Sequence, residues 1–189
     1  MTASMRVRSA AAWALAALAT ASHAAEVRPV VVAGYDAGGA SVISLTYTNG
    51  NTDSIRANEG LYAGAGVSVL NGAGNIEFLG TLSVKYMALH ADNGDITWLR
   101  YPLDALLFYR VPGFRVGGGL TYVIAPRLKG SGEASSIDMK FDDAAGVVLQ
   151  ADYLLERVSL GLRYTILDYK SGGNTIKGSG VGVSFGFTF

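Results

Sequence analysis

The chain has 189 residues, of which half are hydrophobic and only 16% are charged, so it indicates one domain or two small ones and excludes a disordered chain. The absence of cysteine excludes disulfide scaffolds and thiolate metal sites. Basic and acidic residues balance at 15 each, so the composition gives no basic footprint for nucleic acid.

Residues 1–24 contain the three parts of a secretory signal peptide in the expected order. Two arginines come first, residues 10–21 form an apolar run, and Ser22 and Ala24 supply small residues before a cleavage site. The apolar run is too short for a membrane-spanning helix, which needs about 20 residues. The sequence therefore predicts a cleaved signal peptide, followed by a mature domain over residues 25–189.

Beyond the signal peptide, apolar residues recur at every second position, which indicates β-strands. Between Ile76 and His90, for example, the even positions are mostly apolar and the odd positions are mixed polar. One face of each such strand is continuously apolar, and the opposite face carries the charges together with small residues. Because charge is too scarce to coat a soluble protein, we expect the apolar faces to contact lipid and the polar faces to line a packed interior.

Turn signals divide the mature region into eight segments of this kind. The predicted strands are residues 28–48, 54–70, 76–91, 96–110, 114–128, 137–154, 158–169 and 177–189. The first is expected to kink near Gly38 and Gly39. An even number of strands is typical of bacterial outer-membrane barrels. The sequence therefore predicts an all-β fold, a closed eight-stranded antiparallel up-and-down transmembrane β-barrel with short periplasmic turns and longer outer loops.

Aromatic residues give an independent check on this topology. Three adjacent strands each carry two outward aromatic residues eight positions apart. The pairs are Phe78 and Tyr86, Tyr101 and Tyr109, and Phe114 and Tyr122. At about 3.3 Å per residue and a tilt near 40°, each pair spans roughly 20 Å along the membrane normal. We therefore predict that these residues form two aromatic girdles bordering the lipid-facing band.

The last predicted strand ends in an alternating apolar pattern. Its apolar positions are Val181, Val183, Phe185, Phe187 and Phe189. The pattern resembles the C-terminal signature of bacterial outer-membrane barrels, which the barrel assembly machinery recognises. The mature chain resembles, as architecture, the small eight-stranded outer-membrane barrel families: the OmpA membrane domain, OmpX and Ail, and the opacity proteins. No stretch identifies one member, so no functional residue is carried over.

The resemblance implies a location in the outer membrane of a Gram-negative bacterium. Outer-membrane lipid and lipopolysaccharide would then surround the chain, and the assembly machinery would be its partner during insertion. We expect a monomer, with no nucleic acid, metal or cofactor.

Eight ionisable residues fall on the face predicted to point away from lipid. They are Glu77, Lys85, Arg100, Asp104, Arg115, Arg127, Asp152 and Arg163. An eight-stranded barrel is just wide enough to be filled by side chains, so these charges should pair. With Lys85 roughly opposite Tyr101, we expect Asp104 to accept a hydrogen bond from Arg100, Lys85 or another inward arginine. The favoured interpretation is a salt-bridged plug, and the alternative is a narrow gated conduit.

The segment from Ser41 to Asn58 is the best candidate for a contact with a partner. A membrane strand needs about 9–11 residues, so this hairpin should project outside. Ile43, Leu45 and Tyr47 make it apolar for an exposed ribbon, which favours contact with an extracellular partner or lipopolysaccharide. The alternative is a passive extension that packs on neighbouring loops.

Catalysis finds little support in the sequence. His90 is the one histidine beyond the signal peptide, and no serine stands two residues from it. Asp138, Asp142 and Asp143 are interpreted as a solvated strand end rather than a cation site. The sequence therefore predicts a structural or surface-interaction protein of the outer membrane, not an enzyme. The alternatives are a narrow channel and a lipid A-modifying enzyme.

Overall fold

The computed structural model describes residues 25–46, 50, 52–91 and 94–189. The predicted signal peptide and Tyr47 of the predicted contact set lie outside the described residues. None of the described residues belongs to a helix that is long and apolar enough to cross a membrane.

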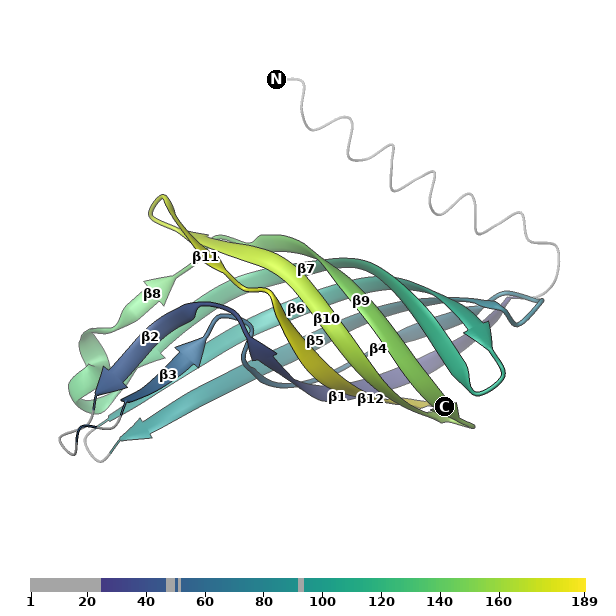
Figure 1. The fold of residues 1–189 in the computed structure, drawn as a ribbon, viewed down its shortest axis with the longest axis horizontal. Coiled ribbons are helices and arrows are strands. Elements are labelled where there is room, and N and C mark those ends of the chain that lie inside the picture. The colour runs from purple at the N-terminus through teal and green to yellow at the C-terminus, as the bar shows by residue number, and fades with distance from the viewer. Residues whose placement is uncertain (1–24, 47–49, 51, 92–93) are drawn as a thin grey trace, which may run out of the picture.

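Eight long strands form a closed barrel (Figure 1). These strands are β1 (Glu26–Gly38), β4 (Gly60–Leu70), β5 (Ile76–Ala91), β6 (Gly94–Val111), β7 (Phe114–Gly130), β9 (Ala144–Leu155), β10 (Val158–Ser171) and β12 (Gly180–Thr188). Each pairs antiparallel with the next in this order. β12 then pairs with β1, placing Val30 opposite Thr188, and this pairing closes the sheet. The predicted eight-stranded up-and-down barrel is confirmed.

The remaining elements lie at one end of the barrel (Figure 1). They are β2 (Ser41–Thr46), β3 (Thr52–Arg56), β8 (Asp138–Lys140), β11 (Asn174–Lys177) and the short 3-10 helix η1 (Gly132–Ser136). β2 and β3 form a separate two-stranded hairpin, while β8 pairs with the outer end of β7 and β11 pairs with the outer end of β10. Short turns join the strands at the opposite end. Because outer-membrane barrels have short periplasmic turns and longer outer loops, we assign the elaborated end to the extracellular side.

The first two predicted strands are each broken in the structure. Gly38 and Gly39 have φ values of +107° and +88°, so the expected kink is a full break between β1 and β2. A second break, which the sequence analysis did not predict, separates β3 from β4 just before Gly60. Gly60 has a φ of +149°, and a Cβ atom there would lie 2.8 Å from the carbonyl oxygen of Tyr86. These breaks let the hairpin fold back toward the mouth of the barrel.

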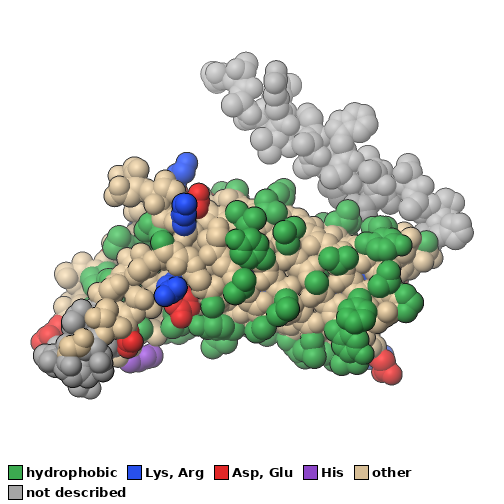
Figure 2. Space-filling view, viewed as in Figure 1, with side chains coloured by type: hydrophobic (Ala, Val, Ile, Leu, Met, Phe, Trp, Pro, Cys, Tyr) green, Lys and Arg blue, Asp and Glu red, His purple; other side chains and the backbone are tan. Residues whose placement is uncertain are grey.

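The outer surface of the barrel carries a broad apolar belt. Leu61 and Leu162 are 65% and 69% exposed, and most outward positions between them around the barrel are also large and apolar. Figure 2 shows hydrophobic side chains along the length of the barrel, with most charged side chains at the extracellular end. Monomeric soluble proteins rarely expose so large an apolar surface, whereas a lipid-facing barrel requires one.

The six predicted girdle residues lie on this outer surface at two levels. Phe78, Tyr109 and Phe114 lie near the short turns, and Tyr86, Tyr101 and Tyr122 lie toward the extracellular end. Five of them are exposed, and Phe78 is partly covered.

A bulge in β7 reverses which side chains point outward beyond it. Ala125 has a positive φ of 47°, and its N–H donates to Oδ1 of Asp143 at 2.9 Å. The extra residue shifts the strand by one position, so Leu128 is buried and Arg127 points outward. The prediction that Arg127 lies in the interior is therefore wrong.

Candidate functional site

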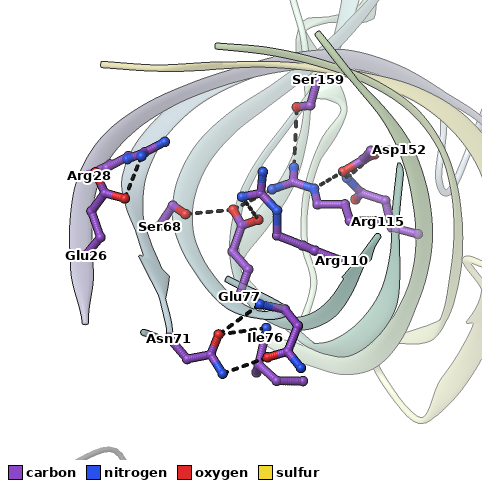
Figure 3. A network of polar contacts seen from close by, with 12 residues as sticks. Glu26, Arg28, Ser68, Asn71, Ile76, Glu77, Arg110, Arg115, Asp152 and Ser159 are labelled. Carbon is purple, nitrogen blue, oxygen red and sulfur yellow. Dashed lines mark hydrogen bonds and ion pairs between the residues drawn. The ribbon is translucent and has the colours of Figure 1, made fainter. Parts of the chain in front are cut away.

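The interior of the barrel holds the other seven residues of the predicted lumen set. All seven are buried, and they form two groups along the barrel axis. Figure 3 shows the group near the short turns. Glu77 accepts hydrogen bonds from Arg115 at 2.6 Å, Arg110 at 2.9 Å and Ser68 at 2.6 Å. Arg115 also donates to Asp152 at 2.6 Å, so each buried charge in this lower group has an opposite partner.

The upper group contains a carboxylate that the sequence analysis missed. Asp36 accepts a hydrogen bond from Nζ of Lys85 at 2.5 Å, and Nε of Arg163 lies 3.8 Å from its other oxygen. Asp104 accepts a hydrogen bond from Arg163 at 3.1 Å, not from Lys85 or Arg100. The partner of Asp104 is therefore the third of the expected possibilities, another inward arginine.

Two details of the strand pairing explain these differences. Asp36 lies between the outward positions of Tyr35 and Ala37, so the alternation of β1 already directs it inward. Lys85 lies opposite Arg100 rather than Tyr101, one residue away from the predicted register.

Arg100 differs from the other interior cations. It is completely buried, and in the described part of the chain it forms no ion pair with a carboxylate. Nη1 donates to the carbonyl oxygen of Ala57 at 2.5 Å, and Nη2 donates to the carbonyl oxygen of Glu59. Its guanidinium group also lies 4.9 Å from the ring centroid of Trp98.

Three small cavities lined by described residues lie in the interior, an upper, a middle and a lower one, each with a volume of about 20 Å³. A cavity of this size holds about one water molecule. Tyr62, Asp104 and Arg163 line both the upper and the middle cavity, while Arg115 and Ser159 line both the middle and the lower cavity. The interior is thus divided by ion-paired side chains, which supports the plug interpretation over an open conduit.

The extracellular end has an apolar core of its own. Ile55 and Ala57 are fully buried against a cluster of barrel side chains that includes Trp98, and Ile43 packs against the same cluster. The ring of Trp98 makes edge contacts with Phe141 at 4.9 Å and with Tyr169 at 5.6 Å. The hairpin therefore covers the mouth of the barrel.

This packing corrects the predicted contact set. Ile43 pairs across the hairpin with Ile55, so its side chain is directed into the core rather than toward a partner. Leu45 lies in β2, where the structure describes its backbone only. For Ile43, the interpretation that the hairpin packs on the rest of the molecule is the correct one.

The predicted assembly signal forms β12 and the residue after it. Val181, Val183, Phe185 and Phe189 are exposed on the lipid-facing side, and Phe187 is partly covered, with its ring 5.1 Å from that of Phe189. The inward positions between them are small for a local reason. A Cβ atom at Gly182 would lie 1.8 Å from Oδ1 of Asp36, so glycine makes room for the upper charge group.

No protein-family model matches the sequence, and no curated protein sequence matches it. Solved structures similar in fold include the following two. The attachment invasion locus protein Ail of Yersinia pestis, in complex with the heparin analogue sucrose octasulfate, is 9% identical with a TM-score of 0.54, over 87% of this chain and 99% of Ail. Neisserial surface protein A is 14% identical with a TM-score of 0.52, over 88% of this chain and 100% of that protein.

The chain has the fold of the small eight-stranded outer-membrane β-barrels. The predicted resemblance is therefore confirmed as architecture, and it names no single member. At these identities the likeness extends to the fold alone.

Proposed function

We propose that the chain is an integral outer-membrane protein with a structural or surface-interaction role, and that its extracellular end is the contact surface. The observation that carries this proposal is the combination of a divided interior with an extracellular extension that has its own apolar core. A filled barrel provides a rigid anchor, and rigid scaffolds commonly present binding surfaces at their loops. The names of Ail and neisserial surface protein A, a protein of attachment and invasion and a surface protein, are in keeping with such a role.

The exposed residues of the hairpin are the proposed contacts. Ser41, Ser44, Asp53 and Arg56 are exposed, whereas Ile43 and Ile55 hold the hairpin on the barrel. The described part of the surface offered to a partner is therefore polar, with hydroxyl groups and one charge of each sign. A hairpin fixed from beneath loses little conformational freedom on binding, which favours affinity.

Adhesion of whole cells tests the proposal. We expect cells that display the full protein to bind host cells or matrix-coated surfaces better than cells in which residues 39–59 are replaced by an Asn-Gly turn. A matched control shortens the turn at Gly72–Gly74, on the opposite side of the membrane. Equal adhesion by the full-length strain and a strain lacking the protein would refute the proposal.

Heat-modifiable gel mobility verifies that each variant is folded, because a closed sheet has no free edge at which detergent unfolding can begin.

The enzyme alternative has its own test. Mass spectrometry of lipid A from cells with the protein, with the His90→Ala variant and without the protein would reveal a modification that depends on His90.

A further inference from the structure

Among the described residues, Arg100 is the interior cation that forms no ion pair with a carboxylate, although Asp36 and Glu59 attract its charge from farther away. Lys85, Arg110, Arg115 and Arg163 each pair with a carboxylate, whereas Arg100 does not in the described part of the chain. Burial of a charge without a carboxylate in direct contact is costly, so its presence needs a physical reason.

Oxygen atoms of the hairpin base take the place of a carboxylate at Arg100. The two terminal nitrogens of the guanidinium group donate to two carbonyl oxygens, those of Ala57 and Glu59. Arginine holds a carboxylate or a phosphate in the same way, through two N–H groups directed at two oxygens. The two backbone carbonyl oxygens thus provide the acceptors that a bound carboxylate or phosphate could provide in their place.

A second cation is held by the same segment. Nζ of Lys85 donates to Oδ1 of Asn58 at 3.0 Å, in addition to its bond with Asp36. Displacement of the hairpin base would therefore remove three oxygen acceptors from two cations. The upper group has three cations, Lys85, Arg100 and Arg163, and two carboxylates, Asp36 and Asp104. With the hairpin base displaced, this part of the barrel interior would therefore carry a net positive charge.

The hairpin base is joined to the barrel through glycines. We call the described residues of this segment, 40–46 and 52–59, the lid. Gly39 before it and Gly60 after it have φ values of +88° and +149°, which non-glycine residues rarely adopt. Backbone bonds also hold the lid, from Ala57 N to Ala40 O at 2.9 Å and from Asn58 N to Gly38 O at 3.1 Å. The lid is therefore a distinct segment with its own attachments.

Arg100 lies toward the extracellular end of the barrel interior. It is next to Tyr101 in sequence and pairs with Lys85, the neighbour of Tyr86, so it lies at the level of the outer girdle. Its stacking partner Trp98 belongs to β6 and not to the lid, although the indole N–H of Trp98 also donates to the carbonyl oxygen of Ala57 at 3.3 Å.

We propose that the extracellular mouth of the barrel is a binding site for a small oxyanion, a carboxylate or a phosphate group, and that the chain's own lid masks it. Arg100 is the principal ligand-binding residue, and Lys85 is the second. This site is separate from the polar outer surface of the hairpin and does not depend on its role in adhesion.

A lidless variant tests the site directly. In the chain without residues 1–24, residues 39–59 are replaced by an Asn-Gly turn, and Trp98, the one tryptophan left, reports binding by fluorescence. We expect inorganic phosphate to change this fluorescence saturably in the lidless barrel, with an apparent affinity at least about tenfold above that of the full barrel, because a mask lowers affinity by the fraction of open molecules.

Two arms identify the source of the oxyanion. Inorganic phosphate added to barrels in neutral detergent probes a free solute, and nanodiscs of phosphatidylglycerol against phosphatidylcholine probe a lipid headgroup. Arg100→Gln in the lidless barrel should abolish the response, whereas Arg127→Gln, which changes an arginine on the outside, should leave it unchanged.

A response that survives Arg100→Gln would overturn the proposal, and so would the absence of any response from a folded lidless barrel in both arms. If the lidless barrel does not fold, hydrogen exchange in the full chain decides the question. Phosphate should then accelerate exchange of the Ala57, Asn58 and Glu59 amides, and unchanged rates would refute the site.

Discussion

Asp36 holds two cations in the upper part of the barrel. Its two carboxylate oxygens lie 2.5 Å from Nζ of Lys85 and 3.8 Å from Nε of Arg163, whereas Asp104 forms an ion pair with Arg163 alone among the described residues. Removal of Asp36 leaves Lys85 with only the amide oxygen of Asn58. Removal of Asp104 leaves Arg163 close to Asp36. The two carboxylates are therefore unequal, although both are buried.

We predict that Asp36→Ala destabilises the barrel more than Asp104→Ala does. Loss of one partner from a buried ion pair costs about 3–5 kcal/mol, and Asp36 should lie at the upper end of this range. Urea unfolding in micelles, followed by Trp98 fluorescence, measures the free energy of unfolding. Asp138→Ala, on the exposed side of β8, is the control and should have little effect. A greater loss for Asp104→Ala would contradict the assigned partners.

Arg127 and Asp138 form an ion pair on the outer surface above the belt. Oδ1 and Oδ2 of Asp138 accept hydrogen bonds from the guanidinium group at 2.8 and 2.5 Å. The hydrogen bond from Arg127 is the main cause that lowers the pKa of Asp138 below its ordinary value of 3.8, and charge attraction from Arg127, Lys140 and Lys129 adds to it.

We predict that Arg127→Gln raises the pKa of Asp138 toward its ordinary value, as measured by NMR titration of the carboxyl carbon. A carboxyl group with a lowered pKa stabilises the fold above its unfolded pKa, and this contribution is lost as the pH falls through the folded pKa. The pair should therefore contribute at neutral pH and vanish in acid. Both groups are exposed, so the effect should weaken in high salt. An unchanged pKa in the variant would rule out the pair in solution.

The strands show what the sequence can and cannot predict. Period-two alternation predicted eight barrel strands and placed seven of the eight chosen charges inside, because each strand has one lipid face and one interior face. The prediction for Arg127 was wrong because one extra residue at the Ala125 bulge reverses the inward and outward orientation of all later side chains in β7. No local pattern in the sequence marks such a bulge. The prediction for Ile43 was wrong because the surface on which it packs, the mouth of the barrel, is assembled from strands that are distant in the sequence.

The break between β3 and β4 also depends on distant contacts. Gly60 is the residue at which the lid rejoins the barrel, and it closely approaches the backbone of β5. A side chain there would collide with Tyr86 and require an unfavourable φ. The position is therefore a sensitive point for the attachment of the lid.

We predict that Gly60→Ala loosens the lid while the barrel remains closed. The φ strain alone amounts to roughly 1–3 kcal/mol, and 1.4 kcal/mol already corresponds to about tenfold in an equilibrium. Hydrogen exchange at Asn58 and Glu59 should accelerate accordingly. Gly74→Ala is the matched control, because Gly74 also has a positive φ, +73°, but a Cβ atom there meets nothing within 4 Å. Equal exchange rates in wild type and Gly60→Ala would show that the contact does not hold the lid.

Across the whole molecule, polarity changes with height along the barrel axis. At the level of the belt the interior is ionic and the exterior apolar, as lipid requires. Above the belt the arrangement is reversed, with an apolar core around Trp98 and charged residues such as Lys140 and Lys170 outside. One chain therefore combines a membrane barrel with a water-exposed cap, and the lid is part of that cap.

This arrangement predicts that the barrel does not conduct ions. The cavities at the axis hold about one water each, and the Arg163 and Arg115 groups lie between them. Planar-bilayer recordings of the purified barrel should show no conductance steps beyond those of a heat-denatured sample. The Arg163→Ala variant should also show no conductance steps. Loss of the Arg163 side chain would connect only the upper and middle cavities, while the ion pairs of Arg115 with Glu77 and Asp152 still fill the lower interior. Reproducible steps from the folded wild type would instead favour the narrow-conduit alternative.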